Sequence, residues 1–164
     1  MKFILLTHFK ELDKRSNTGR LVVEVLGSAA EQIRWERNRP PAGLVAEIEA
    51  GGVALVYPGP AGETGGDLTG VRHVILIDGT WHEAKKIHQR SPYLLQARRI
   101  SLVPAAQSVY NLRKNQREAG LCTAECVIQI LRSTGRREEA ERLQERFLAF
   151  IRPLGGLRDE RGDS

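Results

Sequence analysis

The stretch Val74-Ile75-Leu76-Ile77-Asp78-Gly79-Thr80-Trp81 decides the fold class of this chain. Its first four residues are all apolar, which is typical of a parallel strand covered on both faces. Asp78-Gly79-Thr80 then ends the apolar run, and the residues from Trp81 to Gln89 have the spacing of a helix with Ala84 on its inner side. A buried strand that passes directly into a helix is typical of an α/β domain.

The segments on either side continue this alternation of strands and helices. The sequence predicts further strands at Phe3–Thr7, Gln32–Arg37, Val53–Tyr57 and Arg99–Val103. It predicts one helix that starts at Asn17 or Thr18 and ends at Gly27, and others over Leu44–Ile48, Thr123–Leu131 and Ala140–Ile151. His8–Glu11 and Gly59–Gly70 are predicted loops. We therefore expect one α/β domain over residues 1–152, with a mostly parallel sheet flanked by helices, and a disordered tail over residues 153–164.

The composition agrees with one folded domain of 164 residues. Hydrophobic residues make up 41% of the chain, which is enough to bury about 70% of the surface that the unfolded chain exposes. No apolar run approaches the roughly 18 residues that span a bilayer, and Phe3–Leu6 is too short for the core of a secretory signal. Cys122 and Cys126 cannot form a disulfide framework. We expect a cytoplasmic protein without membrane association.

Basic residues are concentrated in one part of the chain. The formal net charge is +5, but residues 79–120 alone hold eight positive side chains against two negative ones, so the remainder sums to −1. Such a stretch can bind the phosphates of a nucleic acid in a salt-sensitive way. An ordinary solvated basic surface explains the same excess equally well. Nucleic acid is the leading candidate partner.

Polar and aromatic residues follow the predicted strands at the edge where parallel sheets bind ligands. Asp78 can accept a proton or bind an amine there, and the Trp81 indole can cover a planar ring or a cation. The structural alternative is that Asp78 or Thr80 caps the following helix and that Trp81 packs in the core. Thr7-His8 and Tyr57 end two further strands and are expected nearby.

Two other segments offer groups that bind anions. Arg113 can hold a carboxylate or a phosphate in a bidentate fork, and Lys114 supplies a point charge, unless both simply face solvent. Asn17–Arg20 offers backbone N–H groups at a helix start, as an anion site or as a plain cap. Thr123 with Glu125 is typical of a helix start.

Several familiar sites are missing from the sequence. His82 and His88 are six residues apart, so they form no His-Glu-x-x-His motif, and the two cysteines lack partners at zinc spacing. There is no Gly-x-Ser-x-Gly, no P-loop and no Gly-x-Gly-x-x-Gly. We expect no bound metal.

Four motifs in order resemble the DTW-domain family of tRNA-uridine aminocarboxypropyltransferases. Asp78-Gly79-Thr80-Trp81 resembles the Asp-x-Thr-Trp signature of that family. The other three are Thr7-His8 with Asn17–Leu21, then Ser108–Lys114, then Gly120–Glu125. The resemblance runs from about Phe3 to about Arg132. Many relatives carry a cysteine cluster before the first strand that resembles a metal site, and this sequence has none, so no zinc is inferred.

The resemblance implies that S-adenosylmethionine donates its 3-amino-3-carboxypropyl group to N3 of a uridine in tRNA, with release of 5′-methylthioadenosine. It also implies a SPOUT-like fold with a knotted cofactor site. The candidate catalytic residues are then Asp78, Thr80 and Trp81. The donor is expected to contact Thr7, His8, Tyr57, Asp78, Trp81, Leu121 and Thr123. The tRNA is expected to contact Asn17, Arg20, Lys85, Arg113 and Lys114.

Two other functions remain open at this point. A SPOUT-type methyltransferase would use the same donor on RNA but transfer its methyl group. A non-catalytic RNA-binding module would use only the basic stretch and would have no affinity for S-adenosylmethionine. The nucleoside product distinguishes the methyltransferase from the aminocarboxypropyltransferase. Binding of S-adenosylmethionine distinguishes either enzyme from the RNA-binding module.

Overall fold

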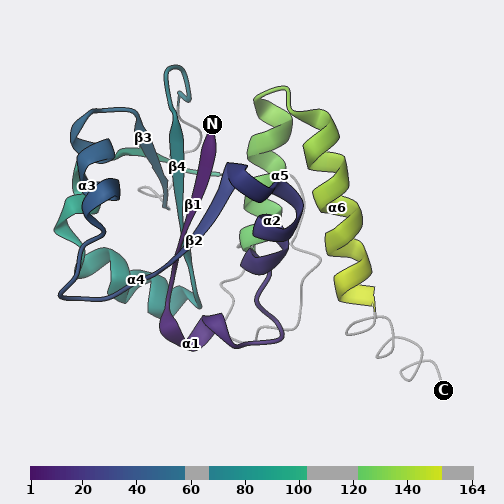
Figure 1. Ribbon diagram of the computed structural model, residues 1–164, viewed down its shortest axis with the longest axis horizontal. Helices are drawn as coiled ribbons and strands as arrows, with labels where there is room; N and C mark the ends of the chain where they lie inside the picture. Colours follow the sequence, from purple (N-terminus) through teal and green to yellow (C-terminus); the bar gives the residue numbers. More distant parts are fainter. Residues whose placement is uncertain (58–66, 103–121, 153–164) are drawn as a thin grey trace.

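A five-stranded sheet lies in the middle of the molecule, between two layers of helices (Figure 1). The structure is a computed structural model that describes residues 1–57, 67–102 and 122–152. The strands are β1 (Lys2–Thr7), β2 (Ala30–Arg34), β3 (Val53–Val56), β4 (His73–Asp78) and β5 (Arg98–Ile100). The helices are α1 (Phe9–Leu12), α2 (Gly19–Leu26), α3 (Ala42–Glu49), α4 (Trp81–Gln89), α5 (Thr123–Ser133) and α6 (Arg137–Ile151), with 3-10 turns η1 (Gly27–Ala29) and η2 (Pro92–Gln96).

The sheet has the strand order β2-β1-β4-β3-β5, and every pair of neighbouring strands is parallel. The α/β fold with a parallel sheet is therefore confirmed. Strand β4, which contains the apolar run Val74–Ile77, lies between β1 and β3. Its register with β1 ends on the pair Thr7 and Asp78, so these two side chains meet at the carboxyl edge of the sheet.

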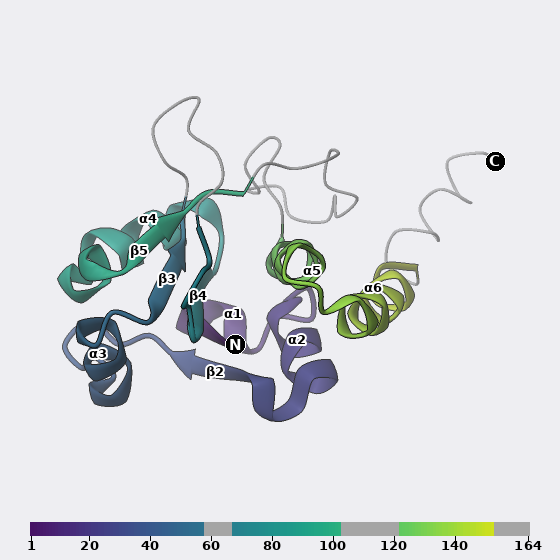
Figure 2. The same ribbon diagram turned by 90° about the horizontal axis from the view of Figure 1, so that it is seen from above.

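Two hydrophobic cores form because successive side chains of a strand point to opposite faces of the sheet. Helices α2, α5 and α6 cover one face, and α3, α4 and η2 cover the other (Figure 2). The first core contains Phe3, Leu5, Val74, Leu76, Leu21, Val127 and Leu143. The second contains Ile4, Leu6, Ile75, Leu55, Leu44, Ile87 and Trp35. Each such side chain contributes about 1.5–3 kcal/mol on burial.

Some boundaries differ from the sequence-based prediction. The predicted loop at His8–Glu11 is wrong, because Phe9–Leu12 form the single-turn helix α1. His8 starts it: its backbone is extended and its Nδ1 accepts a hydrogen bond of 3.2 Å from the Lys10 N–H. Histidine is not among the usual capping residues, so this signal was missed. The strand predicted at Gln32–Arg37 is β2, which pairs with β1 over Ala30–Arg34 only.

The tryptophan of the core is Trp35, not Trp81. Trp35 is 8% exposed, and its Nε1 donates a hydrogen bond of 2.8 Å to Ser91 Oγ. Trp81 is half-buried at the first position of α4 and belongs to neither core. The structural alternative that placed Trp81 in the core is therefore wrong.

Several of the sequence-based expectations concern residues outside the described ranges. Residues 103–121, which join β5 to α5 and include Arg113, Lys114 and Leu121, lie outside the described residues, as do residues 58–66 and the predicted tail over 153–164. The knotted, SPOUT-like site stays a prediction. Among the helices in the described ranges, none is long and apolar enough to cross a membrane.

Candidate active site

The carboxyl ends of β1 and β4 form a topological switch point. From β1 the chain continues to α2 on one face of the sheet, whereas from β4 it continues to α4 on the opposite face. In open α/β sheets, ligands bind where neighbouring strands lead to opposite faces in this way. Thr7 and Asp78 occupy this point.

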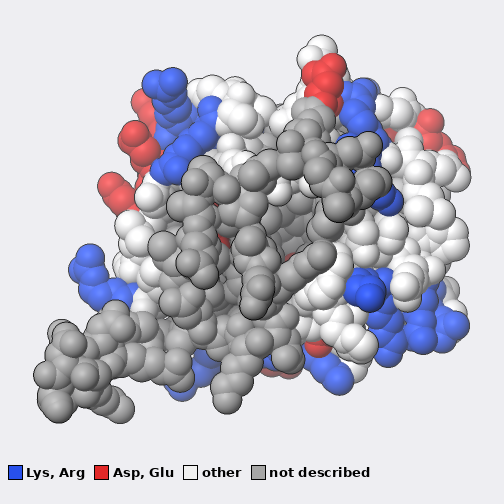
Figure 3. Space-filling view, turned by 180° about the vertical axis from the view of Figure 1, so that it is seen from behind, with Lys and Arg blue, Asp and Glu red and all other residues white. Residues whose placement is uncertain are grey.

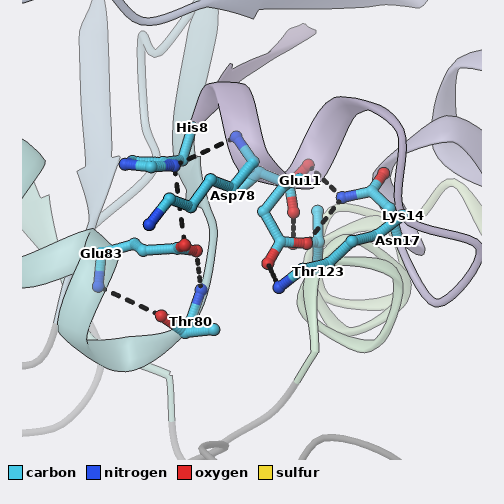
Figure 4. A network of polar contacts seen from close by, with 9 residues as sticks. His8, Glu11, Lys14, Asn17, Asp78, Thr80, Glu83 and Thr123 are labelled. Carbon is cyan, nitrogen blue, oxygen red and sulfur yellow. Dashed lines mark hydrogen bonds and ion pairs between the residues drawn. The ribbon is translucent and has the colours of Figure 1, made fainter.

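The Asp78 carboxylate is the centre of a buried polar network (Figure 4). Asp78 is 1% exposed. Its Oδ2 accepts hydrogen bonds from Asn17 Nδ2 at 2.8 Å, Thr7 Oγ1 at 3.3 Å and Gln32 Nε2 at 3.4 Å, and its Oδ1 accepts one from Thr123 Oγ1 at 2.9 Å. These donors come from β1, β2, the turn before α2 and the start of α5. One carboxylate therefore links four segments that are distant in sequence.

Two helix N-termini face the same carboxylate. Thr123 is the first residue of α5, and Gly19 is the first residue of α2. A Cβ added at Gly19 would lie 2.5 Å from Asp78 Oδ2, so Gly19 allows the carboxylate to approach the backbone of α2. The partial positive charge of a helix N-terminus stabilises an anion. Burial of the Asp78 charge is thus compensated by hydrogen bonds and by helix dipoles.

The segment after Asp78 starts α4 with a capping box. The Glu83 N–H donates to Thr80 Oγ1 at 3.2 Å, and the Thr80 N–H donates to Glu83 Oε1 at 2.9 Å. Of the two caps that the sequence left open, Asp78 or Thr80, Thr80 is the one that caps α4, whereas the Asp78 side chain points into the network on the other face of the sheet. Glu83 Oε2 also lies 3.5 Å from His8 Nδ1, a contact that is an ion pair only when His8 is protonated.

His8 is a buried, uncharged member of this edge. Burial lowers the pKa of the His8 imidazole below its usual value, and the opposing effect of Glu83 is smaller. The Nδ1 atom accepts the Lys10 N–H, so it carries no proton. The ring stacks on Phe9 at 4.7 Å and lies 6.4 Å from the Trp35 ring. His8 therefore works as a cap and a stacking ring at neutral pH.

Aromatic side chains gather on the face opposite the Asp78 network. Tyr57, just after β3, stacks on His88 with ring centroids 3.9 Å apart and lies 5.7 Å from the Trp81 ring. The Arg99 guanidinium carbon is 5.6 Å from the Tyr57 ring centroid. Burial, reinforced by Arg99, lowers the pKa of His88. Tyr57 and Trp81 thus lie together, in a different cluster from Asp78.

The two cysteines are poor nucleophiles. Both are free thiols at the start of α5. Burial raises the pKa of Cys126 to about 12 and holds the pKa of Cys122 well above its usual value. The thiolate, not the thiol, is the reactive form. Covalent catalysis by either cysteine at neutral pH is therefore disfavoured.

Among the candidate RNA contacts, those in the described residues have different surroundings. Asn17 is buried in the Asp78 network. Arg20 donates to the Arg15 carbonyl at 2.6 Å, and its guanidinium lies 5.8 Å from the Phe150 ring of α6. Lys85 is exposed on α4. On the face in Figure 3, Lys and Arg side chains lie in several separate groups with acidic side chains among them.

Comparison with known proteins decides the family. The sequence matches the DTW domain over residues 1–154. The chain belongs to the DTW-domain family. The curated tRNA-uridine aminocarboxypropyltransferase 2 of Drosophila melanogaster is 30% identical over 128 residues, which cover 76% of this chain and 48% of that relative. The chain thus spans about half the length of this relative. No solved structure matches the chain.

The DTW domain contains two site residues that the sequence analysis did not single out. Gln32 donates to Asp78 from β2, and Glu11 is a second buried carboxylate beside Asn17. Gln32 lies two residues after the buried Ala30, so both side chains point to the same face of β2. The alternation of side chains along the strand could therefore have predicted that Gln32 faces inward. Glu11 is in a segment predicted as a loop, and no local pattern marks it.

Substituting Gly19 tests how tightly the Asp78 network of the DTW domain is packed. Gly19→Ala would place a methyl group 2.5 Å from Asp78 Oδ2, and we expect the free energy of unfolding to fall by about 1–3 kcal/mol. Gly43→Ala in α3 is the matched control, because nothing lies within 4 Å of its added Cβ. It should leave stability unchanged or raise it by about 0.5–1 kcal/mol. Urea denaturation measures both, and equal effects would contradict the close packing at Gly19.

The buried imidazole of His8 predicts a pH-dependent stability of the DTW domain. Its pKa is lowered in the folded state, so the unfolded chain takes up the proton first as the pH falls. The contribution of neutral His8 is complete above about pH 6.5, the unfolded value, and is lost as the pH falls through the folded pKa. In His8→Asn, which keeps a capping acceptor, stability should decrease less between pH 7 and pH 5 than in the wild type. Identical pH profiles would contradict the prediction.

Proposed function

We propose that this DTW domain transfers the 3-amino-3-carboxypropyl group of S-adenosylmethionine to N3 of a uridine in tRNA, with release of 5′-methylthioadenosine. Family membership and the name of the Drosophila relative support this reaction class. The observation that carries the proposal is the buried Asp78 network at the β1–β4 switch point, because the signature of the family lies there. The basic stretch supports an RNA substrate.

The side chains at this edge fit the chemistry of such a donor. S-adenosylmethionine supplies a methylene carbon bound to a sulfonium: attack by uridine N3 forms the N–C bond, the C–S bond breaks with its electron pair left on sulfur, and the N3 proton goes to a base. Aromatic faces such as those of Tyr57 and Trp81 attract cations and cover planar rings. The hydroxyl groups of Thr7 and Thr123, together with the Asp78 carboxylate, suit a polar aminocarboxypropyl chain.

Asp78 contributes primarily by holding this edge in place. It is 1% exposed and accepts hydrogen bonds from Thr7, Asn17, Gln32 and Thr123 within the described part of the chain. To bind the ammonium of the donor or to take the N3 proton, the carboxylate would exchange one of these donors for the substrate. Thr123 donates to Oδ1 and is the first residue of α5. Orientation of the methylene rather than the methyl toward N3 then decides the product.

Label transfer tests the proposed reaction directly. Unmodified tRNA is incubated with the protein and with S-adenosylmethionine that carries a label in its carboxyl group. Label in the RNA together with free methylthioadenosine supports the proposal. Methyl transfer with release of S-adenosylhomocysteine would indicate the methyltransferase alternative. Salt-sensitive tRNA binding without affinity for the donor would indicate an RNA-binding module, and either result overturns the proposal.

Asp78→Asn is expected to lower the rate of transfer at least about 100-fold, because the new amide N–H₂ replaces one acceptor oxygen and faces the donors of that oxygen, which are Thr123 on the Oδ1 side or Asn17, Thr7 and Gln32 on the Oδ2 side. Asp67→Asn is the matched control: Asp67 is an exposed acid that interacts with Thr69 and Arg98 outside the network. It should retain wild-type turnover. tRNA affinity, measured by filter binding, should be nearly unchanged in both. Wild-type turnover of Asp78→Asn would remove Asp78 from the mechanism.

The basic segment outside the described residues supplies the prediction for tRNA. Exchange of Arg113 and Lys114 for Ala should weaken tRNA binding and reduce the steepness of the plot of log affinity against log salt by about 2, one for each lost phosphate contact. Arg146→Ala in α6, which removes an exposed ion pair with Glu24, is the control and should not change the slope. An unchanged slope in the double variant would place both residues away from the phosphates.

A further inference from the structure

Glu11 is an acidic side chain with no exposed surface, and the proposed reaction does not use it. It is in the single-turn helix α1, between the end of β1 and the turn that leads into α2. An ionised carboxylate is costly to bury unless it is paired and hydrogen-bonded. Its place beside the Asp78 network therefore requires an explanation.

Glu11 connects to Asp78 through one amide nitrogen (Figure 4). Asn17 Nδ2 lies 2.8 Å from Asp78 Oδ2 and 3.4 Å from Glu11 Oε2. The two carboxylates thus share the two N–H bonds of one amide group. On its other oxygen, Glu11 accepts a hydrogen bond of 3.0 Å from Lys14 Nζ, and the Lys14 side chain is 41% exposed.

The remaining groups of Asn17 are also engaged. Its Oδ1 accepts the Arg20 N–H at 3.1 Å and faces Gln32 Nε2 at 3.5 Å. A neutral amide has two N–H donors and two lone pairs on oxygen, so this side chain uses its full capacity. The orientation of the amide is therefore determined: nitrogen toward the two acids, oxygen toward the first turn of α2.

We propose that Glu11 is a positioning residue. It fixes the orientation of the Asn17 amide, the amide in turn orients the Asp78 carboxylate, and Lys14 balances the charge of Glu11. This role deepens the proposed function and rests on it for its catalytic consequence. Without Glu11, one Asn17 N–H loses its acceptor, and the amide is free to rotate away from Asp78. The fold does not depend on the ion pair with Lys14, because the Lys14 side chain is 41% exposed and an ion pair that reaches solvent contributes little to stability.

The double variant Glu11→Met with Lys14→Met separates positioning from folding. Methionine fills a similar volume and leaves neither charge behind. We expect a single cooperative urea transition with the variant still folded without urea, a kcat of the folded protein at least about tenfold lower and KM values for donor and tRNA within about threefold. Glu24→Met with Arg146→Met, which removes an exposed ion pair, is the matched control and should keep wild-type kcat. A wild-type kcat in the Glu11 variant, or a kcat that falls only with the folded fraction, would overturn the proposal.

A second measurement does not depend on turnover. The side-chain NH₂ of Asn17 gives its own pair of signals in a ¹⁵N correlation spectrum, assigned by their loss in Asn17→Ala. In the Glu11 variant, these protons should shift and exchange with water at least about tenfold faster, whereas the Glu24 control should not change them. Unchanged exchange in the Glu11 variant would overturn the positioning role even if label transfer succeeds. If the wild type transfers no label but the amide responds, the proposed reaction fails and the link from Glu11 to Asp78 stands.

Discussion

The buried charge of Asp78 is the constraint on which the site depends. A carboxylate with 1% exposure is stable only where donors replace the water that it has lost. Here the donors come from Thr7, Asn17, Gln32 and Thr123, and the N-termini of α2 and α5 add their partial positive charge. Because those elements are distant in sequence, the network forms only when the sheet and the helices have assembled.

The same constraint explains the order of polar and small residues around β1 and β4. Gly19 leaves room for an oxygen atom that a methyl group would displace. Asn17 supplies two N–H donors at a place where Asp78 and Glu11 both need one. Local rules assign Asn17, Gly19 and Thr123 to ordinary helix starts, and they do start helices, but their side chains also face the buried acid.

The separation of the aromatic residues from Asp78 follows from the pleat of the sheet. Side chains alternate between the faces of a strand, so Val74, Leu76 and Asp78 share one face and Ile75 and Ile77 the other. After β4 the chain passes to α4 on the second face, and Trp81 lies there beside Tyr57. A bound molecule that touches both Asp78 and Trp81 would therefore extend across the edge of the sheet.

The sequence by itself determined the parallel α/β fold, the strand before Asp78, a helix cap at Asp78 or Thr80 and the resemblance to the family, because apolar runs, caps and short motifs are local in the chain. Only the tertiary structure decided which residues surround Asp78. Gln32 and Glu11 reach it through strand pairing and through one turn of helix capped by His8. Such contacts depend on register and on which face a side chain occupies, and no window of neighbouring residues contains that information.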